Sequence, residues 1–250
     1  ASIGRVCPAP CEKKCRRNLV DDAPVSIREI KRVVGDVCLH EGTMGHIPEI
    51  VENGQSVAVV GAGPAGLSAA LFLRRKGYKV DLYDKEPLFG GMMRYGIPDY
   101  RLPQDVLQAE VEWILANGVT AHPNTALGRD VSLDELRESH DAVLLALGCW
   151  KSSPMRCAGE NLPGVWGGIN FLYKVNRREP VAVGRRVAVV GGGNTAMDAA
   201  RCARRYGAEK VFVVYRRTQA EMPAEPVEIQ EAMEEGVEFL FLAAPKAVEG

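Results

Sequence analysis

A glycine-rich turn between an apolar run and a helical pattern limits what this chain can fold into. The segment Val57–Gly66 reads VAVVGAGPAG, with four apolar residues followed by glycines at positions 61, 63 and 66. A short continuous apolar run is typical of a buried parallel strand, and residues 67–75 then read as a helix. In this order each glycine has a task. Gly61 makes the tight turn, Gly63 lets a pyrophosphate approach the backbone, and Gly66 lets the helix pack close to the strand.

The helix end and the next strand complete this pattern. Phosphates then bind at the free N–H groups and the positive dipole end of the helix. A second run, Lys79–Tyr83, reads as a strand that ends at Asp84, eighteen residues after Gly66. An acid at that place can hydrogen-bond a ribose hydroxyl. The pattern therefore predicts a dinucleotide-binding unit; the alternative is a glycine turn with a purely structural role.

The composition is that of an ordinary globular protein and excludes several function classes. With 250 residues, of which 46% are apolar and 25% charged, the chain can hold one large or two medium domains. A formal net charge of −1 argues against nucleic acid as the main partner. No apolar run approaches the roughly 18 residues of a membrane span. Seven cysteines, three clustered and four scattered, do not resemble a secreted disulfide framework, so we expect a reduced, cytoplasmic compartment.

Three cysteines gather near the beginning of the sequence. Cys7, Cys11 and Cys15 lie among Pro8 and Pro10, which argue against a regular helix, and a basic run follows. Thiolates ligate iron–sulfur clusters, and nearby positive charge offsets the negative charge of a cluster. The spacing is not one of the common zinc spacings. Because a cluster needs four ligands, the alternative is a partial site or a set of surface thiols.

A long irregular segment and further regular elements follow Asp84. Residues 88–103 carry Gly90, Gly91 and Pro98 among large apolar side chains, a composition suited to wrapping a large apolar ligand. The remaining pattern predicts amphipathic helices at 24–37 and 105–117, a short helix with a capping box at 132–140, and a strand at 141–147 ended by Gly148. This order of strands and helices predicts a doubly wound α/β domain.

The opening pattern recurs 130 residues later, after the turn-rich residues 149–183. RRVAVVGGGNTAMDAARCARR matches QSVAVVGAGPAGLSAALFLRR, which indicates a second dinucleotide-binding unit. Its second strand, Lys210–Tyr215, ends in Arg216 and Arg217 and not in an acid. Positive, multi-donor side chains at that edge favour a 2′-phosphate and therefore NADP(H). The alternative is that the two arginines only solvate the end of the strand.

The two units differ in the residue that follows the second strand, an acid in the first and an arginine in the second, and this difference implies two different nucleotides. FAD with NADPH is the economical pair, because hydride passes from nicotinamide to flavin and electrons leave singly through iron–sulfur. Hydride transfer needs no Ser-His-Asp or paired-carboxylate machinery, and the sequence shows no such pattern. No catalytic side chain is therefore predicted.

Several segments together resemble one known family. In chain order they are GRVCPAPCEKKC, PVSIREIKR, GAGPAGLSAA, GGMMRYGIPDYRLP, LLALG, GGGNTAMDAAR and VYRRTQAEMPAE. They are similar to the small (beta) subunit of NADPH-dependent glutamate synthase and its relatives. These relatives include the flavoprotein subunit of NADH-dependent ferredoxin:NADP oxidoreductase and the N-terminal part of dihydropyrimidine dehydrogenase. The resemblance runs through essentially the whole chain.

The resemblance implies three sets of cofactor-binding residues. FAD is expected on Gly61, Gly63, Pro64, Ala65, Gly66, Asp84, Lys85, Gly90, Gly91, Arg94, Ile97, Pro98, Leu102 and Gly148. NADP(H) is expected on Gly192, Gly193, Asn194, Thr195, Asp198, Arg216 and Arg217. The thiols of Cys7, Cys11 and Cys15 are expected as ligands divided between two [4Fe–4S] clusters.

The fold implied is α/β, with two Rossmann-like doubly wound units preceded by a small helical iron–sulfur segment. We expect the iron–sulfur segment at 1–50, the first part of an FAD domain at 51–178 and the first part of an NADP domain at 179–250. Relatives have cysteines upstream of this stretch and a further segment downstream. We therefore expect the chain to be a piece of a longer polypeptide, truncated at both ends.

The function implied is that of an electron-input subunit. It takes hydride from NADPH onto FAD and passes electrons through [4Fe–4S] clusters to a partner in a hetero-oligomer. The partner is a catalytic large subunit, such as the glutamate synthase alpha chain, or ferredoxin. The alternatives are a ferredoxin-linked or flavin-bifurcating NADP oxidoreductase subunit, and a non-catalytic scaffold subunit that keeps the fold.

Overall fold

The computed structural model describes residues 1–21, 23–45 and 49–249 and divides the chain into two compact units. The first unit holds Ala1–Arg94 and Asp99–Gly148, and the second holds Tyr95–Pro98 and Cys149–Gly250. Residues 149–178 thus group with the second glycine-rich turn and not with the first. The domain boundaries expected from the sequence stay a prediction, and the one at residue 50 adjoins residues 46–48, which lie outside the described part.

A four-stranded parallel sheet forms the centre of the first unit, in the order β3-β2-β1-β4. Its strands are β1 (Ser56–Val60), β2 (Lys79–Tyr83), β3 (Val119–His122) and β4 (Ala142–Leu145). Val60, the last residue of β1, pairs with Tyr83 of β2 and Leu145 of β4, so three strands end at one edge of the sheet. Val59 and Leu82 are fully buried, as in parallel strands covered on both faces.

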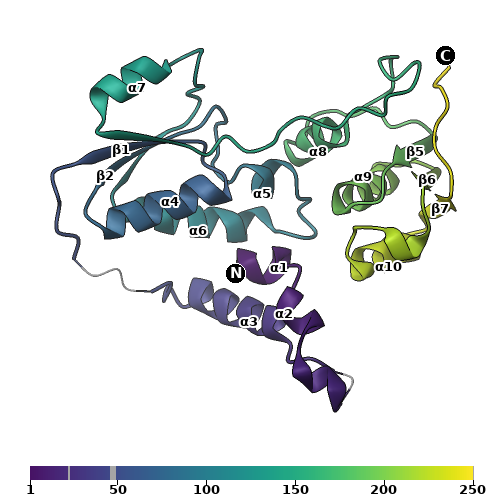
Figure 1. The fold of residues 1–250 in the computed structure, drawn as a ribbon, viewed down its shortest axis with the longest axis horizontal. Coiled ribbons are helices and arrows are strands. Elements are labelled where there is room, and N and C mark those ends of the chain that lie inside the picture. The colour runs from purple at the N-terminus through teal and green to yellow at the C-terminus, as the bar shows by residue number, and fades with distance from the viewer. Residues whose placement is uncertain (22, 46–48, 250) are drawn as a thin grey trace. The chain divides into compact units, whose positions relative to one another are not determined.

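Helices cover both faces of this sheet. Helices α4 (Pro64–Arg75) and α6 (Gln104–Ala116) lie on one face, and α7 (Leu133–Ser139) lies on the other (Figure 1). The capping box predicted for α7 is present: the N–H of Glu135 donates to the Ser132 hydroxyl, and the N–H of Ser132 donates to the Glu135 carboxylate. This arrangement confirms the predicted doubly wound α/β fold of the first unit.

The first residues form short helices, contrary to the irregular structure expected around Pro8 and Pro10. They are α1 (Ser2–Val6), α2 (Pro10–Lys13) and a 3-10 turn (Arg16–Leu19). The longer helix α3 (Ile27–His40) follows, where the sequence predicted a helix at 24–37. Pro10 occupies the first position of α2, where a missing N–H costs nothing. Proline therefore starts a helix here and does not prevent one.

Helices α1 and α3 pack closely because glycine lies on each. A Cβ on Gly4 would collide with the backbone of Arg32, and one on Gly35 would collide with Ala1. Beside this crossing Arg5 donates to both carboxylate oxygens of Asp36, at 2.6 and 2.9 Å, and holds the pKa of that carboxyl below its usual range. Four apolar side chains of α3 are exposed, namely Ile30, Val33, Val34 and Val37.

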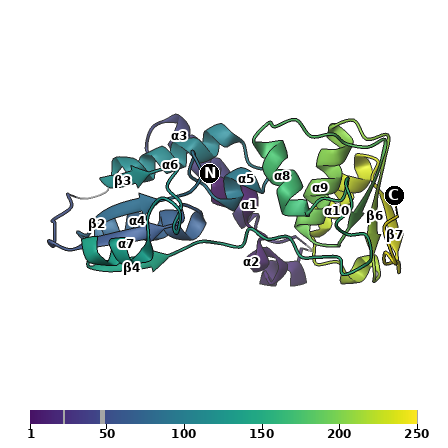
Figure 2. The same ribbon diagram turned by 90° about the horizontal axis from the view of Figure 1, so that it is seen from above.

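The second unit contains a three-stranded parallel sheet in the order β5-β6-β7. Strands β6 and β7 lie side by side in Figure 2. Its elements are α8 (Gly168–Asn176), β5 (Arg186–Val190), α9 (Asn194–Arg205), β6 (Lys210–Tyr215), a 3-10 turn η2 (Gln219–Glu221), α10 (Pro226–Glu234) and β7 (Glu238–Phe241). Helix α9 packs against β5 and β6, and α8 and α10 pack against α9. The order strand, glycine turn, helix and strand confirms the predicted second dinucleotide-binding fold.

Three elements lie where no regular structure was predicted from the sequence. Helix α8 lies within residues 149–183, and the single turn α5 (Met92–Tyr95) lies within residues 88–103. Strand β3 follows directly on α6. In the described part of the chain, no helix has both the length and the apolar character that crossing a bilayer requires.

Candidate dinucleotide sites

Backbone crowding explains the glycines of the first turn. Gly61 has a φ of 105°, and a Cβ there would collide with the carbonyl of Ala146. A Cβ on Gly66 would collide with the carbonyl oxygen of Gly61, so α4 can pack this close to β1 only with glycine at that position. Gly63 caps α4 in extended backbone, and Pro64 and Ala65 open the helix as exposed residues. Gly61 and Gly66 thus serve the tight turn and the close helix packing expected of them, and the approach of a pyrophosphate to Gly63 stays a prediction.

Asp84 is tied to this turn from the end of β2. Its carboxylate accepts the N–H of Ala62 at 2.7 Å on one oxygen and the N–H of Glu86 at 2.9 Å on the other, and the residue is 8% exposed. Each carboxylate oxygen has a second lone pair, so these bonds leave acceptor capacity for a ribose hydroxyl. The residue therefore fits the predicted contact and also braces the turn.

The glycines at 90 and 91 bring a second loop against the first. The N–H of Gly90 donates to the carbonyl of Ala62 at 2.8 Å. A Cβ on Gly91 would lie 2.6 Å from the Cα of Gly63, so the two backbones touch. A Cβ on Gly63 would meet only the Cα of Gly91, at 3.7 Å, so the space beside Gly63 is open. This is a cradle that a side chain would fill, and it fits a phosphate lying against the backbone.

Arg94 holds the second loop in place. Its guanidinium donates to the carbonyl of Phe89 at 2.5 Å and to the side chains of Gln104 and Gln108 on α6, at 3.0 and 2.6 Å. Arg94 is 6% exposed, and Leu102 is fully buried. Both residues thus support the loop from behind, while their predicted contact with FAD stays a prediction. The two glutamines were not predicted from the sequence. Their spacing of four residues places them on one face of α6, and the sequence contains no other indication of their role.

The other residues predicted for FAD are distributed more widely. Lys85 is exposed, with its ammonium 3.8 Å from the Glu86 carboxylate. Gly148 has a φ of 68° at the end of the first unit. Ile97 and Pro98 group with the second unit. The structure therefore brings together the first glycine turn, Asp84 and the 90–91 turn; for the remaining residues FAD contact stays a prediction.

The second glycine turn has a different kind of crowding. A Cβ on Gly192 would lie 2.5 Å from the ring of Tyr215, whereas no atom lies within 4 Å of the Cβ position of Gly193. Helix α9 begins at Asn194, so its positive end faces this open space. Thr195 is exposed in the first turn of the helix, and Asp198 is buried in the second. The open cradle at Gly193 again fits a phosphate.

The loop after η2 packs directly on this turn. The N–H of Ala224 donates to the carbonyl of Gly192 at 3.0 Å, and the N–H of Glu225 donates to the side-chain oxygen of Asn194 at 2.9 Å. Met222 and Ala224 are buried. Asn194 therefore holds this loop through its carbonyl oxygen, which leaves its amide N–H groups as donors for a ligand.

Arg216 and Arg217 are both exposed at the end of β6. The Nε of Arg217 lies 4.0 Å from the Glu221 carboxylate. Within the described residues, Arg216 makes no hydrogen bond and no ion pair. The two guanidinium groups therefore differ in their surroundings, and both are accessible to a phosphate.

The three N-terminal cysteines are not gathered into a metal site. Among the described residues, no three His, Cys, Asp or Glu side chains converge to hold a metal ion. Cys11 is exposed, and Cys7 and Cys15 are partly exposed. The backbone N–H groups of Val25 and Arg17 hydrogen-bond the Cys15 sulfur and lower its pKa, which favours the ligating thiolate. Iron–sulfur ligation by these residues stays a prediction.

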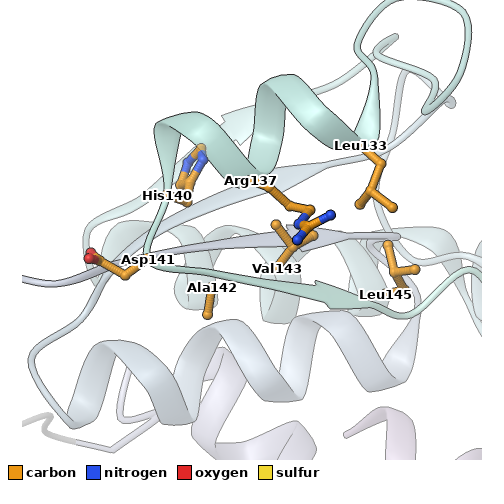
Figure 3. A pocket seen from close by; sticks show the side chains of 7 residues that line it. All are labelled: Leu133, Arg137, His140, Asp141, Ala142, Val143 and Leu145. Atoms are coloured by element: carbon orange, nitrogen blue, oxygen red, sulfur yellow. The ribbon is translucent and has the colours of Figure 1, made fainter.

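A hollow of about 540 Å³ lies between α7 and β4 in the first unit (Figure 3). Its lining consists of Leu133, Arg137, His140, Asp141, Ala142, Val143 and Leu145. Arg137 extends from α7 toward Val143 of the strand. None of the residues predicted for a cofactor lines this hollow, so we do not assign it to a nucleotide.

Comparison with protein families matches residues 55–250 to the pyridine nucleotide-disulphide oxidoreductases. The match covers most of the chain and contains both glycine turns. The chain belongs to the pyridine nucleotide-disulphide oxidoreductase family. It therefore has the fold of pyridine nucleotide oxidoreductases, and the two open cradles at Gly63 and Gly193 fit one nucleotide each.

Curated relatives of this oxidoreductase are named as subunits of NADP-dependent enzymes. The chain is 45% identical, over 98% of its length and 38% of the relative, to the NADP(+)-dependent formate dehydrogenase subunit beta of Moorella thermoacetica. It is 44% identical to the NADPH-Fe(3+) oxidoreductase subunit beta of Geobacter sulfurreducens, over 98% of the chain and 37% of the relative. It is 39% identical to the glutamate synthase [NADPH] small chain of Azospirillum brasilense, over 99% of the chain and 54% of the relative. The chain thus spans about a third to a half of these relatives, and the resemblance to glutamate synthase small subunits is confirmed.

Solved structures show the same fold. FprA of Mycobacterium tuberculosis in complex with NADPH is 21% identical, with a TM-score of 0.68 over 78% of this chain and 61% of that one. Thioredoxin reductase of T. acidophilum is 19% identical, with a TM-score of 0.56 over 78% of this chain and 67% of that one.

Proposed function

We propose that this oxidoreductase is an electron-input subunit that accepts hydride from NADPH and delivers electrons to a partner. The observation that carries the proposal is the contrast between its two glycine turns. One turn is joined to a buried carboxylate, Asp84, and the other lies beside two exposed arginines, Arg216 and Arg217. A carboxylate suits a ribose hydroxyl, and a guanidinium suits a 2′-phosphate.

The chain's own residues bind and orient the nucleotides. The flavin, when bound, supplies the hydride acceptor and the one-electron chemistry. The first turn offers backbone N–H groups at the start of α4 to a pyrophosphate, with Asp84 fixing the adenosine half. Arg94 holds the 90–91 loop against this turn. In the second unit, the start of α9 and the arginines select NADPH. No side chain is required to move a proton from a substrate.

Delivery to a partner forms the second part of the proposal. Electrons leave through [4Fe–4S] clusters, with Cys7, Cys11 and Cys15 as ligands divided between two clusters. Three local thiols do not complete a four-ligand cluster, so further ligands come from elsewhere. The names of the relatives, each a beta subunit or small chain, support a hetero-oligomer. The partner is a catalytic large subunit such as the glutamate synthase alpha chain, or ferredoxin, in a reduced, cytoplasmic compartment.

The first test is the visible spectrum of the protein purified with its native partners, before and after anaerobic NADPH. We expect flavin bands that bleach on addition of NADPH, over a broad iron–sulfur shoulder, with iron and acid-labile sulfide in the same fraction. NADH at equal concentration is the control and should bleach the bands far less. A colourless protein that NADPH does not change would replace the proposal with the scaffold alternative. Identification of the copurifying subunit separates the glutamate synthase type from the ferredoxin-linked or bifurcating type.

A further inference from the structure

The turn that carries the two arginines is closed by one acidic side chain. Glu221 lies at the end of η2, and its carboxylate accepts the N–H of Thr218 at 3.1 Å and the Thr218 hydroxyl at 3.3 Å. The N–H of Glu221 donates back to the carbonyl of Thr218 at 3.2 Å. The Thr218 side chain also accepts from the Glu221 N–H, so the two residues form a capping box, which fixes the backbone directly after the arginines.

The same turn is held at its other side by β6 and the residues after β7. The Tyr215 hydroxyl donates to the backbone carbonyl of Glu221 at 2.9 Å. The N–H of Leu242 donates to the carbonyl of Arg217 at 3.2 Å, and the N–H of Ala243 donates to the carbonyl of Tyr215 at 3.1 Å. The backbone from 215 to 221 is thus fixed at both ends, while the side chain of Arg216 projects from it without a partner among the described residues.

Glu221 also gives the guanidinium groups of Arg216 and Arg217 different electrostatic surroundings. Its carboxylate lies 4.0 Å from Nε of Arg217, so that guanidinium already faces a negative charge. A phosphate dianion is repelled by the same carboxylate and is bound best by a guanidinium that has no anionic neighbour. Arg216 meets this condition.

We propose that Glu221 is a positioning residue for NADP specificity. It fixes the turn through Thr218 and engages Arg217, which leaves Arg216 as the direct ligand of the 2′-phosphate. This inference rests on the proposed function, since it assigns separate roles within the same site. Arg217 then contributes positive charge at longer range.

The experiment compares the dissociation constants of NADP⁺ and NAD⁺ for five variants of the native complex, measured by calorimetric titration. We expect Arg216→Ala to weaken NADP⁺ by roughly 10- to 100-fold, the loss of one charge-assisted contact, and to leave NAD⁺ nearly unchanged. Arg217→Ala should weaken NADP⁺ only about 3-fold. Glu221→Ala should weaken NADP⁺ by about 10-fold, because the turn loosens. Glu221→Gln, which keeps an acceptor for Thr218 and removes the charge, should restore NADP⁺ binding to within about 2-fold of the unaltered protein.

The fifth variant is the matched control, Glu209→Ala. Glu209 is an exposed acid at the opposite end of β6, paired with Arg185, and should change neither constant. If neither Arg216→Ala nor Arg217→Ala changes the ratio of the NADP⁺ dissociation constant to the NAD⁺ dissociation constant, the proposed NADP site is wrong. Three results would leave the site assignment standing and overturn the role of Glu221, provided that the ratio rises in the arginine variants. They are an unchanged NADP⁺ constant in Glu221→Ala, a failure of Glu221→Gln to restore binding, and a loss in Arg217→Ala as large as that in Arg216→Ala.

Discussion

At the scale of single residues, the two glycine turns share a sequence pattern and differ in what requires each glycine. Gly61, Gly66 and Gly91 are required by the protein itself, since a Cβ at each would meet backbone atoms. Gly63 and Gly193 have open space beside them, so only a ligand requires a glycine there. The fold and the binding function thus depend on different glycines of one motif.

This difference predicts opposite results for two neighbouring substitutions. Gly63→Ala should leave the thermal stability of the flavin-free protein nearly unchanged and lower its bound FAD, because the methyl group occupies the phosphate cradle. Gly91→Ala should destabilise the flavin-free protein by about 2 kcal/mol or more, because φ is +53° and the Cβ meets the Cα of Gly63. Denaturant melts and flavin content measured together separate the two effects. Gly184→Ala, on an exposed turn with ordinary backbone, is the control. Equal loss of stability in both variants would contradict the assignment of Gly63 to the ligand.

At the scale of elements, the sequence predicted those parts of the fold that local chemistry determines. The bounds of β2 and β6 agree with the predicted ranges, because each strand begins at a lysine and ends directly before a charged residue, Asp84 or Arg216. The capping box of α7 was also visible in the sequence. Helix α8 was missed because its start, Gly167 and Gly168, carries no helix signal, and its stability comes from packing on α9.

The candidate sites were predictable to the same extent. The glycines, Asp84 and the arginine pair follow from a motif read along the chain. The glutamines that hold Arg94 and the loop at Ala224 that covers the second turn come from distant parts of the sequence. Such contacts depend on how elements pack, and neither periodicity nor spacing contains that information.

One interaction between elements predicts a pH dependence. Arg201 of α9 is nearly buried and donates to Glu228, Glu231 and Glu235 along α10, and Arg205 donates to Glu235 as well. Hydrogen bonds from Arg205, together with those from Arg201, lower the pKa of Glu235 from 4.5 to about 2. A lowered pKa means that this stabilisation is fully present above pH 4.5 and is lost as the pH falls toward 2.

We therefore expect Glu235→Gln to flatten the acid limb of the stability curve. The unaltered protein should lose about 1 to 2 kcal/mol more than the variant between roughly pH 5 and pH 2, after allowance for solvent screening. Urea denaturation at a series of pH values measures this difference. Glu234→Gln, which changes the neighbouring acid on the same helix and leaves Arg201 untouched, should follow the unaltered protein. Parallel curves for Glu235→Gln and the unaltered protein would show that the ion pairs contribute no net stability.

At the scale of the whole molecule, the chain combines two dinucleotide-binding units that are interleaved in sequence. Residues 95–98 group with the second unit although the residues on both sides belong to the first. Arg94, the last residue before this excursion, is fixed in the first unit by its bonds to Phe89 and to α6. The segment 95–98 therefore begins directly after a residue that is held by hydrogen bonds. Each unit keeps its own glycine turn and its own charged residue at the end of the second strand.

Separate units predict separate ligand footprints in hydrogen exchange. Binding to the native state slows the local openings of the segments that contact the ligand. NADP⁺ should therefore protect amides in residues 191–195 and 216–225, while FAD should protect residues 61–66 and 84–91. NAD⁺ at a concentration that gives equal occupancy should protect 191–195 and leave 216–218 exchanging as in the free protein, because it lacks the 2′-phosphate. Mass spectrometry of peptides from the intact complex resolves these segments. If NADP⁺ protects residues 61–66 and not residues 191–195, the assignment of the two nucleotides is reversed. Each turn would then bind the nucleotide disfavoured by the charged residue at the end of its neighbouring strand.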